Sequence, residues 1–186
     1  YFTEYSKETL TNREKFRKNF PLILKRVKPT IFVAVPRIWT SFRKEIETKI
    51  NNLPVRLDRI MPLWLKRLLV KKNLGFERTR IFISAAAFLY EEDREFFKNL
   101  GIPISDIYGQ TETAGPLLID GKQIGTSCKV MLHENNELCV EGPCVMRGYY
   151  RNTRANSTAF TRDGNRIIYH TGDIGKEKNG KILWNG

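Results

Sequence analysis

The sequence predicts an α/β fold: a parallel sheet with flanking helices, followed by a smaller antiparallel β region. Up to residue 115, short apolar runs alternate with amphipathic segments of helical period, which is the pattern of an α/β layer. From about residue 124, short strand-like segments are separated by Gly, Asn and Asp, which is typical of antiparallel strands joined by turns. A hydrophobic fraction of 41% in 186 residues is enough for a folded core.

The helices and first strands follow from apolar spacing and from proline and glycine positions. Helical spacing predicts helices at residues 6–28, 38–50, 62–70 and 91–100, with Pro21 starting a new helix at its first turn. Residues 31–35 form an apolar run without alternation, which predicts a buried parallel strand. Two more strands are expected at 80–83 and 104–108. Pro54 is expected to break the chain and Gly75 to cap a helix. The apolar side of the helix before this cap is expected to consist of Trp64, Leu65, Leu68 and Leu69.

The remaining strands are expected at 137–140, 166–169 and 181–184. We therefore expect residues 1–123 to be part of an α/β subdomain and residues 124–186 to be a truncated β-rich subdomain. The sequence has no internal repeat and no low-complexity linker.

Charge and composition narrow the function classes. Residues 1–80 carry 20 Lys and Arg against 7 Asp and Glu, whereas the rest of the chain is close to neutral. Aromatic residues are not interleaved with this basic charge, so a nucleic-acid partner is not expected. The basic amphipathic segment 63–72 leaves open an anionic membrane surface, with a solvated basic face as the alternative. Three cysteines without a CxxC pair predict free thiols in a reducing compartment, and two histidines disfavour a His-rich metal site.

The densest polar cluster is Tyr-Gly-Gln-Thr-Glu-Thr-Ala-Gly at 108–115, directly after an apolar strand. Ligands of open α/β sheets bind beyond the carboxyl ends of strands, and glycine lets the backbone approach a ligand. The hydroxyls of Thr111 and Thr113 suit phosphate oxygens, Glu112 suits Mg²⁺, and Tyr108 suits a flat base. A polar strand-to-loop turn remains the alternative.

A second cluster, Tyr-His-Thr-Gly-Asp-Ile-Gly at 169–175, allows two interpretations. Asp173 either stabilises a type I turn or accepts hydrogen bonds from vicinal ribose hydroxyls. A third segment, Gly-Pro-Cys-Val-Met-Arg-Gly-Tyr-Tyr at 142–150, has flanking glycines that predict a tight structural corner.

In this order and spacing, these segments resemble the adenylate-forming superfamily, and within it the long-chain fatty acyl-CoA synthetases of the bubblegum type. Residues 28–39 and Ser-Ala-Ala-Ala-Phe-Leu at 84–89 are similar to two further family segments, although Ala85 stands where the family has glycine. The resemblance implies that a fatty carboxylate attacks ATP to give acyl-AMP, which then passes its acyl group to coenzyme A. It implies ATP, Mg²⁺ and coenzyme A as the cofactor and co-substrates, and a cytoplasmic or cytosol-facing peripheral location.

The resemblance also implies roles for individual residues. Thr111 and Glu112 would be catalytic, with Glu112 as the metal ligand. The nucleotide would contact Ala85, Ala86, Tyr108, Gly109, Gln110, Thr111 and Asp173, and the acyl substrate would contact Val35, Arg37, Gly109 and Thr113.

The family's phosphate-gripping loop and its C-terminal domain have no counterpart in this sequence, so we expect an internal fragment that is inactive alone. The alternatives are another adenylate-forming ligase with a different acid or acceptor, and a basic module that binds membrane surfaces.

Overall fold

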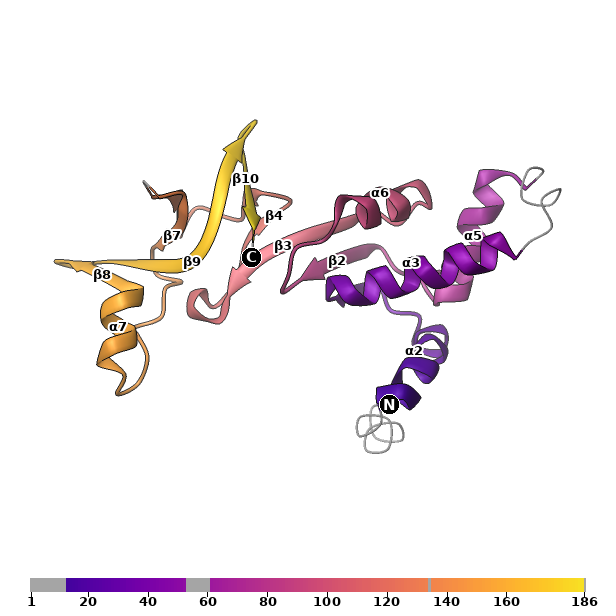
Figure 1. The fold of residues 1–186 in the computed structure, drawn as a ribbon, viewed down its shortest axis with the longest axis horizontal. Coiled ribbons are helices and arrows are strands. Elements are labelled where there is room, and N and C mark those ends of the chain that lie inside the picture. Colours follow the sequence, from indigo (N-terminus) through magenta and orange to yellow (C-terminus); the bar gives the residue numbers. More distant parts are fainter. Residues whose placement is uncertain (1–12, 53–60, 134, 186) are drawn as a thin grey trace. The chain divides into compact units, whose positions relative to one another are not determined.

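The structure is a computed structural model that describes residues 13–52, 61–133 and 135–185 (Figure 1). The predicted start of the first helix before Arg13 and the predicted break at Pro54 lie outside these residues. The chain divides into two compact units. The first contains residues 1–33, 37–83 and 91–104, and the second contains residues 34–36, 84–90 and 105–186.

Helices and short strands alternate in the first part of the chain, as the sequence predicts. Their order is α2 Arg13–Val27, β1 Ile31–Ala34, α3 Pro36–Asn51, α5 Leu63–Leu74, β2 Ile81–Ala85 and α6 Glu91–Asn99. Connections that contain helices join β1 to β2 and β2 to the next strand, which is the arrangement of parallel neighbours.

The prediction that Pro21 starts a new helix is wrong, because α2 runs through it. Residues on both sides of the proline are held by packing. The Phe20 ring stacks on Phe42 with the ring centroids 6.1 Å apart, and Leu24 is buried. These contacts keep one helix continuous where the proline removes a backbone hydrogen bond.

Aromatic rings form the core of the first unit. Trp39 is fully buried, and its ring meets those of Phe32 and Phe97 at centroid distances of 5.2 Å. The Phe76 ring lies 4.8 Å from Phe32 and 5.3 Å from Phe82. Tilted and edge-on rings of this kind add specific attraction to their large buried areas.

The prediction of a fully buried strand at residues 31–35 is wrong. In β1 only Phe32 is buried, while Ile31 and Val33 on the other face are each 54% exposed. In α5 the expected apolar side is open: Trp64 is 66% exposed and Leu68 is 54% exposed.

The packed part of α5 is instead its carboxyl end, where Leu74 is buried and Gly75 forms the predicted cap at φ 75°. A Cβ at Gly75 would collide with the backbone of Leu24, so the close approach of α2 requires glycine at this cap.

The second unit contains the remaining strands. They are β3 Ile104–Gln110, β4 Gly115–Ile119, β5 Lys122–Gln123, β6 Lys129–Leu132, β7 Glu137–Glu141, β8 Phe160–Asp163, β9 Arg166–Lys178 and β10 Lys181–Asn185, with the short helices η1 Thr111–Thr113 and α7 Thr153–Ala159. One sheet has the order β1-β2-β3-β4-β5, and a second has the order β10-β9-β7-β6 with β8 paired to β9. The α/β fold with a separate antiparallel sheet is therefore confirmed.

Antiparallel pairing begins earlier than residue 124, because β4 turns back on β3 after η1. The long strand β9 pairs with β7, β8 and β10 and so organises the second sheet (Figure 1).

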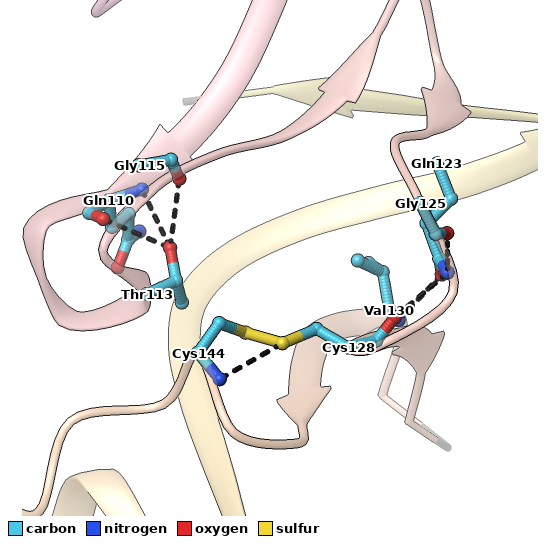
Figure 2. Close-up of a disulfide and its surroundings, with 8 residues drawn as sticks. All are labelled: Gln110, Thr113, Gly115, Gln123, Gly125, Cys128, Val130 and Cys144. Atoms are coloured by element: carbon cyan, nitrogen blue, oxygen red, sulfur yellow. Dashed lines mark hydrogen bonds between the residues drawn. A yellow bond between two sulfur atoms is a disulfide. The ribbon is translucent and has the colours of Figure 1, made fainter.

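The prediction of three free thiols is wrong for two of them. Cys128 and Cys144 form a disulfide (Figure 2). Cys139 is free and buried. Gly142, at φ 135°, lets the chain fold back closely, since a Cβ there would lie 2.9 Å from Cys128 Cα. The fold therefore brings together two cysteines whose spacing in the sequence suggests no pair. The cysteines no longer support the prediction of a reducing compartment.

Within the described ranges, no helix combines the length and the apolar character needed to cross a membrane.

Candidate functional site

The carboxyl end of β3 and the following η1 helix form one side of a pocket in the second unit. Six of the predicted site residues lie in its lining: Ala85, Ala86, Gly109, Gln110, Thr111 and Glu112. Residues 85 and 86 come from the end of β2 and the turn after it, where Ala86 has φ 71°. Segments more than twenty residues apart in the sequence thus meet at one pocket.

Gly109 makes the shape of this wall possible. The pairing of β3 with β4 shifts register between Tyr108 and Gly109, which marks a bulge. A Cβ on Gly109 would clash with the Gly115 carbonyl oxygen and lie 2.7 Å from Pro116 Cα. Only glycine therefore lets the two strands close while η1 projects toward the pocket.

Asp173 is joined to β3 by two hydrogen bonds. Its Oδ2 accepts from the Tyr108 hydroxyl at 2.8 Å and from Gln110 Nε2 at 2.7 Å. Gln110 also donates to the Thr171 carbonyl at 3.3 Å and accepts from the Tyr169 hydroxyl. Because both bonds to Asp173 fall on one oxygen, the carboxylate is held in place while Oδ1 remains for a further donor.

Of the two interpretations of the second cluster, the type I turn is wrong, because residues 171–173 lie inside β9. They form an irregularity opposite β7: His170 pairs with Cys139 and Ile174 pairs with Glu137, so three residues of β9 face one residue of β7. Gly172 takes φ 77° at this point. A bulge that redirects a side chain next to a binding site is a recurrent device, and here it directs Asp173 toward Tyr108.

Tyr108 is 6% exposed, and its ring lies 5.2 Å from that of Trp184 on β10. Burial raises the pKa of the Tyr108 phenol above its usual range, and the charge of Asp173 acts in the same direction. The phenol therefore stays protonated and remains a donor to Asp173 at all ordinary pH values.

Glu112 is held from two sides by the segment at 142–150. The Tyr149 hydroxyl donates to Glu112 Oε1 at 2.8 Å, and the Met146 amide donates to the Glu112 carbonyl oxygen at 2.8 Å. The hydrogen bond to Glu112 is the main cause that raises the pKa of Tyr149. The Tyr149 phenol thus orients one oxygen of the Glu112 carboxylate, and Glu112 lines the pocket.

Thr113 differs from Thr111 in its surroundings. Thr111 is exposed at the pocket, whereas Thr113 is 3% exposed. The Thr113 hydroxyl bonds to the Gln110 carbonyl at 2.9 Å, the Gly115 carbonyl at 3.2 Å and the Gln110 amide at 3.2 Å (Figure 2). In this conformation Thr113 fixes the loop between β3 and β4.

The two remaining predicted residues are solvent-facing. Val35 is 46% exposed in the short link after β1, and Arg37 is exposed in the first turn of α3. Val35 belongs to the second unit and Arg37 to the first.

Sequence reasoning missed the two tyrosines that support the site. Tyr149 was expected only at a structural corner, and Tyr169 only in a strand, yet they hydrogen-bond to Glu112 and Gln110 respectively. The one available signal was that each lies in a segment that resembles a family motif.

Comparison with known proteins agrees with this geometry. Residues 9–150 match the family model described as AMP-binding enzyme. The chain is 30% identical over 196 residues to the long-chain-fatty-acid–CoA ligase ACSBG2 of Homo sapiens, covering 82% of this chain and 29% of that protein. It is 29% identical over 202 residues to long-chain-fatty-acid–CoA ligase 1 of Saccharomyces cerevisiae, covering 86% and 28%.

Solved structures share the fold. The adenylation domain of a carboxylate reductase from Mycobacterium chelonae has a TM-score of 0.72 at 20% identity, over 89% of this chain and 28% of that one. A long-chain-fatty-acid-CoA ligase from Archaeoglobus fulgidus has a TM-score of 0.63 at 16% identity, over 94% and 36%.

The chain thus spans about 29% of the length of the first relatives it matches. The family model covers most of the chain. The pocket lined by Thr111 and Glu112, and Asp173 bonded to Gln110 of its lining, lie in the segments whose order suggested the resemblance. The chain belongs to the family of AMP-binding enzymes.

Proposed function

We propose that this chain supplies part of the nucleotide site of an enzyme that activates a long-chain fatty acid as its adenylate and passes the acyl group to coenzyme A. The observation that carries the proposal is the hydrogen-bonded group of Tyr108, Gln110 and Asp173 beside a pocket lined by Thr111 and Glu112. The relatives named long-chain-fatty-acid–CoA ligases support the choice of acid and acceptor.

In the proposed reaction, a carboxylate oxygen bonds to the α-phosphorus of ATP and the bond to pyrophosphate breaks. The sulfur of coenzyme A then loses its proton to solvent and bonds to the acyl carbon, the bond from this carbon to the phosphate oxygen breaks, and AMP leaves. Both steps bring anions together, so positioning and charge neutralisation matter more than a general base.

The proposed roles follow the geometry. Oδ1 of Asp173 would accept from the ribose hydroxyls, since Oδ2 is already occupied. Thr111 would donate to the α-phosphate. Ala85, Ala86 and Gly109 have no bulky side chains and would allow the adenine and the carboxylate to approach the backbone.

Glu112 fits a Mg²⁺ ion bound together with ATP. Mg²⁺ in such sites is held by one or two carboxylates plus substrate phosphates, and Glu112 offers its second oxygen from the pocket lining. When bound, the ion would neutralise phosphate charge. Tyr149 would keep the carboxylate oriented through its 2.8 Å hydrogen bond.

The test is ATP–pyrophosphate exchange by the full-length protein with a panel of carboxylic acids. We expect exchange with long-chain fatty acids, its loss in Glu112→Ala with the fold retained, and little change in Glu177→Ala, which removes an exposed glutamate of β9. Exchange only with aryl or short acids would refute the fatty-acid assignment. Near-normal exchange in Glu112→Ala would refute the metal role.

A second candidate function, binding to an anionic, cytosol-facing membrane surface, is favoured by α5. Trp64 and Leu68 are exposed on this helix, and the basic residues Arg67 and Lys71 belong to the same helix. An interfacial helix combines these two features, apolar side chains and adjacent basic charge. We expect co-sedimentation with vesicles that contain anionic lipid and a marked loss in a Trp64→Ser/Leu68→Ser variant. Equal binding of this variant and the unmodified protein would contradict the idea.

A further inference from the structure

Three side chains with metal-binding atoms converge on β7 and β9, outside the pocket lining. Cys139 of β7 pairs directly with His170 of β9, and Glu137 lies two residues before Cys139 on the same face of its strand. Their ligand atoms all lie within 4.8 Å of one another. Because two paired strands carry them, their positions are set by the sheet rather than by a mobile loop.

The separations of these atoms suit a tetrahedral ion. His170 Nδ1 lies 3.4 Å from Cys139 Sγ and 3.2 Å from Glu137 Oε2. Zinc bonds of about 2.3 Å to sulfur and about 2.0–2.2 Å to nitrogen and oxygen place neighbouring ligand atoms roughly 3.3–3.6 Å apart. The two separations nearly match this range without any movement of the strands.

A second layer of contacts orients the ligands. His170 Nε2 is 2.9 Å from the Thr161 hydroxyl on β8, and Glu137 Oε1 accepts from the Gly172 amide at 3.0 Å. In the tautomer that donates Nε2–H to Thr161, Nδ1 presents its lone pair to the Glu137 carboxylate and the Cys139 sulfur. A cation bound by the carboxylate, the imidazole nitrogen and the sulfur would replace the protons that otherwise lie between these atoms, and histidine ligands usually have an outer partner of this kind.

We propose that Glu137, Cys139 and His170 bind a thiophilic divalent cation of the zinc class, with a water molecule in the fourth position. The side chains of Glu137 and His170 are 16% and 22% exposed, which gives the ion and the water a route from solvent. Sulfur and imidazole ligands select zinc over Mg²⁺, so this site is chemically distinct from Glu112.

Binding changes the protonation of Cys139. Cys139 is a free, buried thiol. The ion forms the sulfur bond as the S–H bond breaks, and that proton passes to solvent.

The test is Co²⁺ binding to the full-length protein, first freed of metal by chelation and kept in excess Mg²⁺. We expect one equivalent of Co²⁺ to give a thiolate-to-cobalt charge-transfer absorption that Zn²⁺ abolishes. Cys139→Ser is expected to remove this absorption, and Glu137→Gln and His170→Asn to weaken binding at least about 100-fold. Thr161→Val, which changes only the outer partner, is expected to weaken it about 10–100-fold.

Two control variants separate this site from the other histidine and cysteines. His133→Asn and the double variant Cys128→Ser/Cys144→Ser are expected to keep the absorption and the stoichiometry. The proposal is overturned if the unmodified protein gives no cobalt–thiolate absorption, which would make the cluster a hydrogen-bonded group only. It is equally overturned if the absorption survives in a folded Cys139→Ser variant.

Discussion

Replacing Tyr108 by phenylalanine tests the link between β3 and β9 on which the nucleotide site depends. The substitution deletes one hydroxyl and leaves the ring on Trp184, so it removes the 2.8 Å hydrogen bond to Asp173 without opening a cavity. Asp173 keeps its second donor, Gln110 Nε2 at 2.7 Å. The perturbation therefore isolates one hydrogen bond to a carboxylate.

The size of the effect follows from burial and charge. A hydrogen bond to a charged group contributes about 1.5–3 kcal/mol. Asp173 is only half-buried and keeps Gln110, so we expect the lower end, about 1.5 kcal/mol of unfolding free energy. For a protein of this size, that lowers the melting temperature by roughly 3–6 °C.

The assay is denaturant unfolding followed by circular dichroism in a double-mutant cycle with Asp173→Asn. We expect a coupling energy of about 1 kcal/mol between the two positions. The control is Tyr150→Phe, which alters a tyrosine that is 84% exposed and should change stability by less than about 0.5 kcal/mol. Equal costs of Tyr108→Phe with and without Asp173 would refute the reasoning.

Three further predictions concern the same unit. Thr113→Val removes the buried hydroxyl that accepts from the Gln110 amide and should cost about 2 kcal/mol, whereas Thr113→Ser should cost less than half as much; equal unfolding midpoints would contradict this. Reduction of the Cys128–Cys144 disulfide, whose cysteines are 16 residues apart, should lower stability by about 3 kcal/mol, and an unchanged melting temperature with dithiothreitol would count against it. The Tyr108 pKa is raised in the folded state, so the phenol of the unfolded state loses its proton at a lower pH, and stability should fall as the pH rises above about 10. The free energy of unfolding of Tyr108→Phe should fall less steeply with pH, and equal slopes in the two proteins would exclude the effect.

The strands and helices that were predicted have signals that are local. The apolar run at 31–35, the helical spacing of Ile38, Phe42, Ile46 and Ile50, and the glycine cap at Gly75 each depend on a few neighbouring residues. The segment at 108–115 stood out for the same reason, since it concentrates glycine, hydroxyl and carboxylate groups directly after a strand.

Burial was harder to predict, because it depends on which elements meet. The exposed Trp64 and Leu68 have the same spacing as core residues, and Pro21 is tolerated because Phe20 and Leu24 are packed on either side of it. A sequence pattern gives the face of a helix that is apolar but does not say whether another element covers it.

The sequence by itself determined the order of the elements up to residue 110, three of the later strands, the family and the identity of Thr111, Glu112 and Asp173 as candidate residues; it did not predict β4, β5, β6, β8 or α7. Only the tertiary structure decided that Asp173 stands inside a strand, that Tyr149 orients Glu112, and that Cys139 meets His170. These contacts join residues from 31 to 65 positions apart. A bulge in β9 brings Asp173 to Tyr108, and cross-strand register brings Cys139 to His170; neither leaves a signal in the residues on one strand alone.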